Sequence, residues 1–95
     1  SSLTFEAPDK KTFRNLDLAY EAMKRGGNSP CILNAANEIV VDAFLKNKLR
    51  FTEMPDVIEQ CMNDVKWLSA PTLEDYLETD KNARLLANEI ILKTV

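Results

Sequence analysis

The sequence contains no histidine, only two glycines and only two cysteines among its 95 residues. Without histidine, the chain lacks the commonest general base and the commonest metal ligand of proteins. Two glycines are too few to form the glycine-rich turns that bind the phosphates of dinucleotides or of nucleoside triphosphates. These shortages predict that the 95 residues hold no catalytic, cofactor-binding or metal-binding residue of their own.

Basic residues are also too few for a nucleic-acid-binding protein. The chain has 12 Lys and Arg against 15 Asp and Glu, which gives a net charge of −3. A protein that binds nucleic acid or an anionic membrane surface normally carries a basic patch. Long apolar runs and a signal-like first segment are missing as well. We therefore expect a soluble chain without a targeting signal, located in the cytoplasm, that binds neither nucleic acid nor membrane.

The two cysteines, Cys31 and Cys61, are too far apart for a zinc site or a redox pair. Both fall on apolar faces of predicted helices, where a free cysteine behaves as a small hydrophobic residue. The sequence therefore predicts two reduced core thiols and favours them over a disulfide.

The first 14 residues differ in pattern from the rest of the chain. Residues 1–6 alternate apolar and polar side chains, which predicts a half-buried strand, and Pro8 ends it. Residues 10–14 look like a polar connector. No second strand pattern follows, so this strand has no partner within the chain. We expect residues 1–14 to be an extended arm that pairs with a sheet supplied from outside these residues.

Residues 15–95 are predicted to form an all-α domain, a bundle of four to five helices. Asn15 is expected to cap the first helix, and residues 26–27, both glycine, to end it. Four residues with helical spacing are expected to face the core: Leu16, Ala19, Tyr20 and Met23.

Ser29 is expected to cap a second helix over residues 30–46, with Pro30 in its first turn. This helix is apolar around most of its circumference, which is typical of a central helix. Its core face is predicted to contain Ile32, Ala36, Ile39, Val40 and Ala43, and its exposed stripe Ala35, Glu38, Asp42 and Lys46.

Thr52 is expected to cap a third helix, and Trp67 to close it as a core anchor, or as a contact surface if it is exposed. Its apolar stripe contains Met54, Val57, Ile58, Cys61, Met62 and Val65. Thr72 and Asp75 predict a capping box at the start of a short helix that reaches about Glu78.

A last helix is expected from Thr79 or Asp80. Its core stripe contains Ala83, Leu86, Ala87, Ile90, Ile91 and Thr94. Leu85 and Leu92 lie on its opposite side. We expect these two leucines to dock against a neighbouring domain or another protein copy, although scattered exposed leucines are also common without such a role.

Several polar groups could carry chemistry but have simpler structural explanations. Residues 26–29 could hold a phosphate at a helix N-terminus. A helix stop and cap is the favoured explanation, because no Lys or Arg lies in the first turn of the following helix. The carboxylate pairs Glu53/Asp56 and Glu74/Asp75 fall in first turns, where negative charge stabilises a helix. Asp42 and Lys46 form an i, i+4 pair.

Asn37 is the most unusual residue of the second helix. It projects into the apolar arc, and asparagine costs a helix about half a kcal/mol relative to alanine. A buried amide without partners would cost about 1–3 kcal/mol more. We therefore expect Asn37 to be buried and to bind the backbone of the arm or of a loop, with Asn34 as a weaker contributor; the alternative is a partly exposed, hydrated side chain.

Seven stretches, in order over essentially all 95 residues, resemble the C-terminal part of the 1-deoxy-D-xylulose 5-phosphate reductoisomerase family. They are residues 3–9 (LTFEAPD), 16–23 (LDLAYEAM), 26–27 (GG), 33–38 (LNAANE), 43–45 (AFL), 50–52 (RFT) and 80–84 (DKNAR). The chain departs from the family pattern at Arg14 and Asn15, where the family tends to have an aromatic residue or Arg followed by Pro.

The resemblance implies a homodimeric enzyme of the methylerythritol phosphate route to isoprenoids. Such an enzyme isomerises 1-deoxy-D-xylulose 5-phosphate and reduces it with NADPH to 2-C-methyl-D-erythritol 4-phosphate, with a divalent metal ion, Mg²⁺ or Mn²⁺. It implies that residues 1–14 end a connecting segment and that residues 15–95 form the C-terminal helical domain. The NADPH-binding and catalytic domains of the same chain would be its partners, and its location would be the bacterial cytoplasm, or a plastid if the source is a plant. The alternative is a stand-alone helical adaptor that binds a partner protein through its arm and its second apolar stripe.

Overall fold

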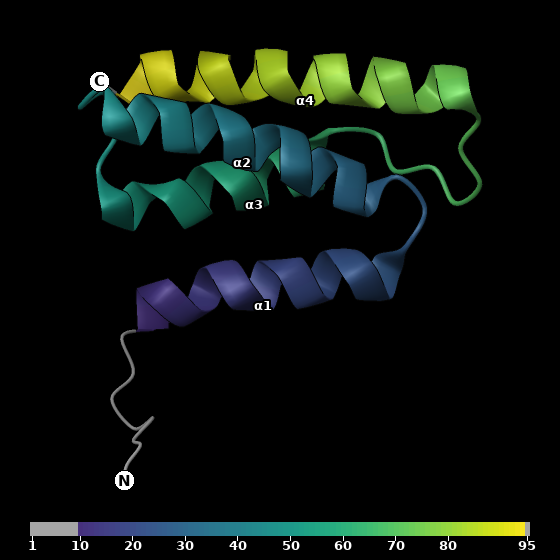
Figure 1. The fold of residues 1–95 in the computed structure, drawn as a ribbon, viewed down its shortest axis with the longest axis horizontal. Helices are drawn as coiled ribbons and strands as arrows, with labels where there is room; N and C mark the ends of the chain where they lie inside the picture. Colours follow the sequence, from purple (N-terminus) through teal and green to yellow (C-terminus); the bar gives the residue numbers. More distant parts are fainter. Residues whose placement is uncertain (1–9, 95) are drawn as a thin grey trace, which may run out of the picture.

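The computed structural model describes residues 10–94 (Figure 1). They form four α-helices, with a 3-10 turn before the third: α1 (Lys10–Arg25), α2 (Ser29–Leu45), η1 (Phe51–Glu53), α3 (Met54–Asp64) and α4 (Leu73–Thr94). No strand occurs among these residues. The predicted all-α fold is confirmed, whereas the strand expected at residues 1–6 lies outside the described part.

The second helix is central, as its composition predicts. In Figure 1, α2 runs between α4 and α1, and α3 also packs against it. The buried side chains of α2 are Ser29, Ile32, Ala35, Ala36, Val40 and Ala43. Ala35 was expected on the exposed stripe, and that expectation is wrong. Its side of α2 is covered by α4, since the next turn places Glu38 against Arg84 of that helix.

The first helix begins at Lys10, so residues 10–14 are helical and not an extended connector. Its predicted core set is also wrong. Leu18 and Ala22 are buried, whereas the side chains of Leu16, Tyr20 and Met23 are 50%, 66% and 74% exposed. The reason is that α1 lies at the edge of the bundle, where its main contacts are with α2 and α3.

An ion-pair cluster contributes to this orientation of α1. Arg14 pairs with Asp56 and Glu59 on α3. Its hydrogen bonds raise the pKa of the guanidinium, the bond to Asp56 by more than the bond to Glu59. The ion pairs hold the side of α1 that carries Arg14 and Leu18 against α3. The apolar stripe that begins at Leu16 therefore faces away from α3.

The apolar stripe of α3 is confirmed in full, because each predicted member, from Met54 to Val65, is buried. The helix starts differently from the prediction. Thr52 lies inside η1 and does not cap α3. At the other end, α3 stops at Asp64 and Trp67 lies beyond it with 41% of its surface exposed, so Trp67 is not a core anchor.

The last helix is a single element of 22 residues rather than two helices. The predicted capping box is present: Asp75 N–H donates to Thr72 Oγ1, and Thr72 N–H donates to Asp75 Oδ2. The predicted break at Thr79 is absent because this side chain is buried and accepts a hydrogen bond from Asn28 inside the bundle. None of the described helices is both long and apolar enough to cross a membrane.

Candidate functional surfaces

The acidic residues of the described region take part in local structure. Glu53 accepts a hydrogen bond from the Arg50 N–H, Asp56 pairs with Arg14, and Asp75 caps α4. Across residues 10–94, no group of three His, Cys, Asp or Glu side chains is arranged to hold a metal ion. These carboxylates therefore offer no metal centre of that kind in the described bundle.

Both cysteines are free thiols, as predicted, but only Cys61 is a core residue; Cys31 is partly buried, so its predicted place in the core is wrong. Cys61 is buried, and its Sγ donates a long hydrogen bond to the Ala83 carbonyl at 3.9 Å. Burial raises the pKa of the Cys61 thiol to about 11, and the charge of Asp64 adds to the effect. Burial, followed by Asp80, also raises the pKa of Cys31. Thiols that stay protonated are poor nucleophiles and poor metal ligands.

The glycine pair between α1 and α2 forms a tight joint. Gly26 and Gly27 have φ of 67° and 57°, a left-handed conformation that stops α1 as expected. A Cβ on Gly27 would lie 2.1 Å from the Leu68 carbonyl oxygen. Asn28 N–H donates to the same carbonyl at 3.0 Å. The loop is therefore packed against the α3–α4 connection and serves as a helix stop and joint, which explains it without a phosphate.

Asn28 makes the kind of contact that we expected of Asn37. Its Nδ2 donates to the Lys66 carbonyl and to Thr79 Oγ1, both at 2.9 Å, and its Oδ1 accepts from the Leu68 N–H at 2.8 Å. Asn28 is fully buried. One amide thus holds two loops and α4 together. The signal in the sequence is an asparagine after two glycines at the start of the most apolar helix, a pattern that also fits a simple helix cap.

Asn37 itself is exposed, so its predicted burial is wrong. Its neighbour Asn34 is exposed too and donates to Glu38 Oε2 at 3.4 Å. Both line a cleft of about 240 Å³ between α1 and α2, whose other walls are Asn15, Ala19, Leu33 and Ile58. The apolar arc of α2 is wider than the surface that its neighbours cover, which explains why Asn37 stays outside the core.

One ion pair, between Arg84 and Glu38, links α4 to α2. Arg84 donates to Glu38 at 2.8 Å and to Asp80 at 2.9 Å. These hydrogen bonds, the one to Asp80 first, raise the pKa of the Arg84 guanidinium. The predicted pair of Asp42 and Lys46 is present at 3.1 Å on the surface. These pairs are solvated and fix side chains without forming a reactive centre.

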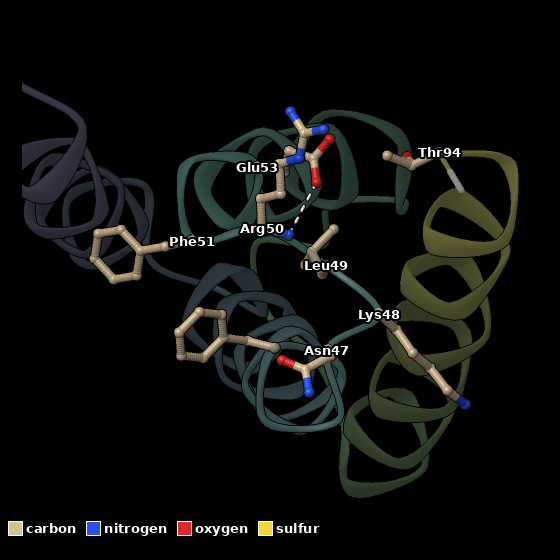
Figure 2. Close-up of a pocket in the computed structure, with 8 residues that line it drawn as sticks. Asn47, Lys48, Leu49, Arg50, Phe51, Glu53 and Thr94 are labelled. Carbon is tan, nitrogen blue, oxygen red and sulfur yellow. Dashed lines mark hydrogen bonds between the residues drawn. The ribbon is translucent and has the colours of Figure 1, made fainter.

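A hollow of about 680 Å³ lies where α2 turns into η1 near the end of α4 (Figure 2). Figure 2 shows Lys48 directed toward α4 and Phe51 on the opposite side. The Arg50 N–H donates to Glu53 Oε1 at 2.9 Å. Phe44 and Phe51 contact edge to face with their ring centres 5.9 Å apart. The hollow is open and mixed in character, and no buried polar group points to a ligand there.

Trp67 contacts the joint between α1 and α2 from outside. Its Nε1–H donates to the Gly26 carbonyl at 3.1 Å, and the Arg25 guanidinium lies 5.7 Å from the ring centre. Leu85 and Leu92 on α4 are 58% and 77% exposed. Docking of these two leucines onto another domain or protein copy stays a prediction.

A family model described as the DXP reductoisomerase C-terminal domain matches residues 1–86. The chain belongs to this family. The match covers the four helices down to the middle of α4, and the resemblance inferred from the seven stretches is confirmed.

Curated relatives agree with the family match. The chain is 59% identical over 91 residues to the 1-deoxy-D-xylulose 5-phosphate reductoisomerase of Phocaeicola vulgatus, which covers 96% of this chain. It is 57% identical over 93 residues to that of Bacteroides fragilis, which covers 98%, and 51% identical over 81 residues to that of Lachnospira eligens, which covers 85%. The chain spans about a quarter of the length of these relatives: 24%, 24% and 21%, respectively.

Proposed function

We propose that this chain is the C-terminal support domain of a 1-deoxy-D-xylulose 5-phosphate reductoisomerase. The observation that carries the proposal is the 59% identity over 96% of the chain to an enzyme of that name, at the part that the family description calls C-terminal. The complete enzyme would isomerise 1-deoxy-D-xylulose 5-phosphate and reduce it with NADPH to 2-C-methyl-D-erythritol 4-phosphate. This identity favours the enzyme domain over the stand-alone adaptor.

The residues of this domain do not fit NADPH or a divalent metal ion. The chain has two glycines, and both are used at the α1–α2 joint. The described carboxylates form no group of three that could hold Mg²⁺ or Mn²⁺. We therefore assign NADPH and metal binding to the parts of the enzyme that precede this domain, and we derive no catalytic step from these 95 residues.

The remaining parts of the proposal concern assembly. The NADPH-binding and catalytic domains of the same polypeptide are the partners of this domain, and the complete enzyme is a homodimer in the cytoplasm. Residues 1–14 end the connecting segment, of which residues 10–14 already belong to α1. A support domain acts by holding the neighbouring domains in place, so its loss should remove activity without removing a catalytic group.

A chimeric enzyme tests this proposal. In it, the present chain replaces the matched C-terminal part of the Phocaeicola vulgatus enzyme. We expect the chimera to oxidise NADPH in the presence of 1-deoxy-D-xylulose 5-phosphate at a rate within about tenfold of the parent, a loss of about 1.4 kcal/mol in transition-state stabilisation at most. The parent truncated before the matched part is the control and should be inactive.

The isolated chain should neither turn over the sugar phosphate nor bind NADPH in a fluorescence titration. A folded chimera that is no more active than the truncated parent would contradict the proposal. Saturable micromolar binding of NADPH to the 95 residues would contradict the assignment of the cofactor to the preceding domains.

A further inference from the structure

One side of α1 carries an apolar stripe that the bundle leaves uncovered. Leu16, Tyr20 and Met23 are each at least half exposed. At 3.6 residues per turn they share one side of the helix, next to Asn15 and Ala19, which line the cleft toward α2. Contiguous exposed apolar surface of this kind marks interaction sites more often than isolated exposed leucines do.

The cleft beside this stripe is lined by three asparagine amides over an apolar floor. Asn15, Asn34 and Asn37 contribute the amides, and Ala19, Leu33 and Ile58 the floor. Within residues 10–94, the Asn15 Oδ1 is buried and receives no hydrogen bond. A primary amide has two donors and an acceptor, so it can pair with both the N–H and the C=O of a peptide group. A row of such amides on an apolar floor suits an extended main chain.

The uncovered surface continues along α2. Val41 and Phe44 follow Asn37 by one and two turns, and each is 37% exposed. Phe44 leads to Phe51 of η1, which is 45% exposed. We call this surface, made of Leu16, Tyr20, Met23, Asn34, Asn37, Val41, Phe44 and Phe51 around the amide-lined cleft, the α1–α2 face.

The relatives indicate what covers the face. In them, the matched part is 24% of the polypeptide and is its C-terminal domain, so most of the enzyme precedes it. The preceding polypeptide reaches this domain at the start of α1, the helix that bears the stripe. The outer side of α4 lies across α2 from α1 (Figure 1) and is further from that entry point.

We propose that the α1–α2 face is the surface on which the preceding part of the same polypeptide docks. Its main chain pairs with the exposed amides of Asn34 and Asn37 beside Asn15, and its apolar side chains cover Leu16, Tyr20 and Met23. This inference rests on the proposed function, because it names the face through which the support domain holds the rest of the enzyme. It also gives the exposed Asn37 a use that the isolated bundle does not.

Methionine oxidation tests the contact in the unmodified chain. Met23 is 74% exposed, whereas Met54 and Met62 are 6% and 4% exposed and serve as internal references. We expect hydrogen peroxide to oxidise Met23 at least about tenfold more slowly in the chimeric enzyme than in the isolated chain, because docking excludes solvent from an interface core. Peptide mass spectrometry measures the rates.

The outcomes separate the two proposals. An active chimera in which Met23 oxidises as fast as in the isolated chain overturns the docking face and leaves the proposed function standing. A folded but inactive chimera overturns the proposed function, and the docking face with it. Slower oxidation of Met23 at higher concentrations of the isolated chain, together with dimers in sedimentation, would assign the face to a second copy and overturn the inference.

The substitution Asn37→Ala provides a second readout, with Asn82→Ala on α4 as the matched control. Both asparagines are exposed within a helix. In the isolated chain, both changes should raise the unfolding midpoint by about 2–4 °C, because alanine is the better helix former. In the chimera, Asn37→Ala should lower the temperature of half-inactivation and Asn82→Ala should not. An increase with Asn37→Ala in both proteins would overturn the inference.

Discussion

Two asparagines of the same amide chemistry have opposite surroundings in this domain. Asn28 is fully buried and forms three side-chain hydrogen bonds to groups distant in the chain, whereas Asn37 is exposed on α2. The difference arises from the segment that each residue faces. Asn28 faces the α3–α4 connection, and Asn37 faces a cleft. The residue type therefore determines which groups a side chain can bind, and the segments packed around it in the fold determine whether it binds them.

The substitution Asn28→Ala should lower the free energy of unfolding by about 2–4 kcal/mol. It would leave Thr79 Oγ1 without its partner in a buried place, and the Lys66 carbonyl and the Leu68 N–H without theirs in partly buried ones. Urea unfolding of the isolated chain measures the change, and Asn37→Ala, which removes an exposed amide, is the control. Equal stability of Asn28→Ala and the unmodified chain would show that the joint does not depend on this amide.

At the scale of elements, the loops that join the helices help to fix how the helices are placed. Gly26 and Gly27 stop α1 with the same left-handed conformation, yet their surroundings differ. Space is open within 4 Å of a Cβ placed on Gly26, whereas the same atom on Gly27 would overlap the Leu68 backbone. The α3–α4 connection therefore packs tightly against Gly27 and leaves space for a side chain at Gly26.

The pair Gly26→Ala and Gly27→Ala should separate these two effects. Gly26→Ala should lower the free energy of unfolding by about 1–2 kcal/mol, because alanine is strained in the left-handed conformation. Gly27→Ala should cost more, about 3 kcal/mol or above, because the Leu68 segment must also move and loses its packing. Thermal and urea unfolding of the two variants check the order. Equal losses would mean that the loops can separate freely.

At the scale of the molecule, the described part is long and flat, with extents of 46 × 31 × 17 Å. Such a shape gives a small core and broad open faces, which agrees with a domain that is completed by the rest of an enzyme. All four helices contribute to the core, and Cys61 lies inside it beside Ala83. Global stability should therefore respond to the ionisation of this thiol.

Burial raises the pKa of Cys61 from an ordinary 9.0 to about 11, so the folded state holds the thiol proton more tightly than the unfolded chain does. The stability that depends on the neutral thiol is complete below pH 9 and is lost as pH rises toward 11. We expect the free energy of unfolding to fall more steeply over this range than in Cys61→Val, which has no such group. Parallel pH profiles of the two proteins would contradict this expectation.

Periodicity along the chain was enough to predict the all-α class, the central position of α2 and the complete buried stripe of α3. These features follow from local patterns: a clean apolar stripe has only one stable side to bury. Short stretches such as residues 33–38 were also enough to predict the family. The capping box at Thr72 and the helix stop at residues 26–27 were equally local.

Only the tertiary structure decided the features that depend on a second segment. Helix α1 has two apolar sides, and its place at the edge buries Leu18 and Ala22 while Leu16, Tyr20 and Met23 stay open. Thr79 reads locally as a helix start, yet α4 passes through it because Asn28 supplies a buried partner. A hydrogen bond or an apolar contact needs both partners, and the chain pattern around one residue does not contain the position of the other.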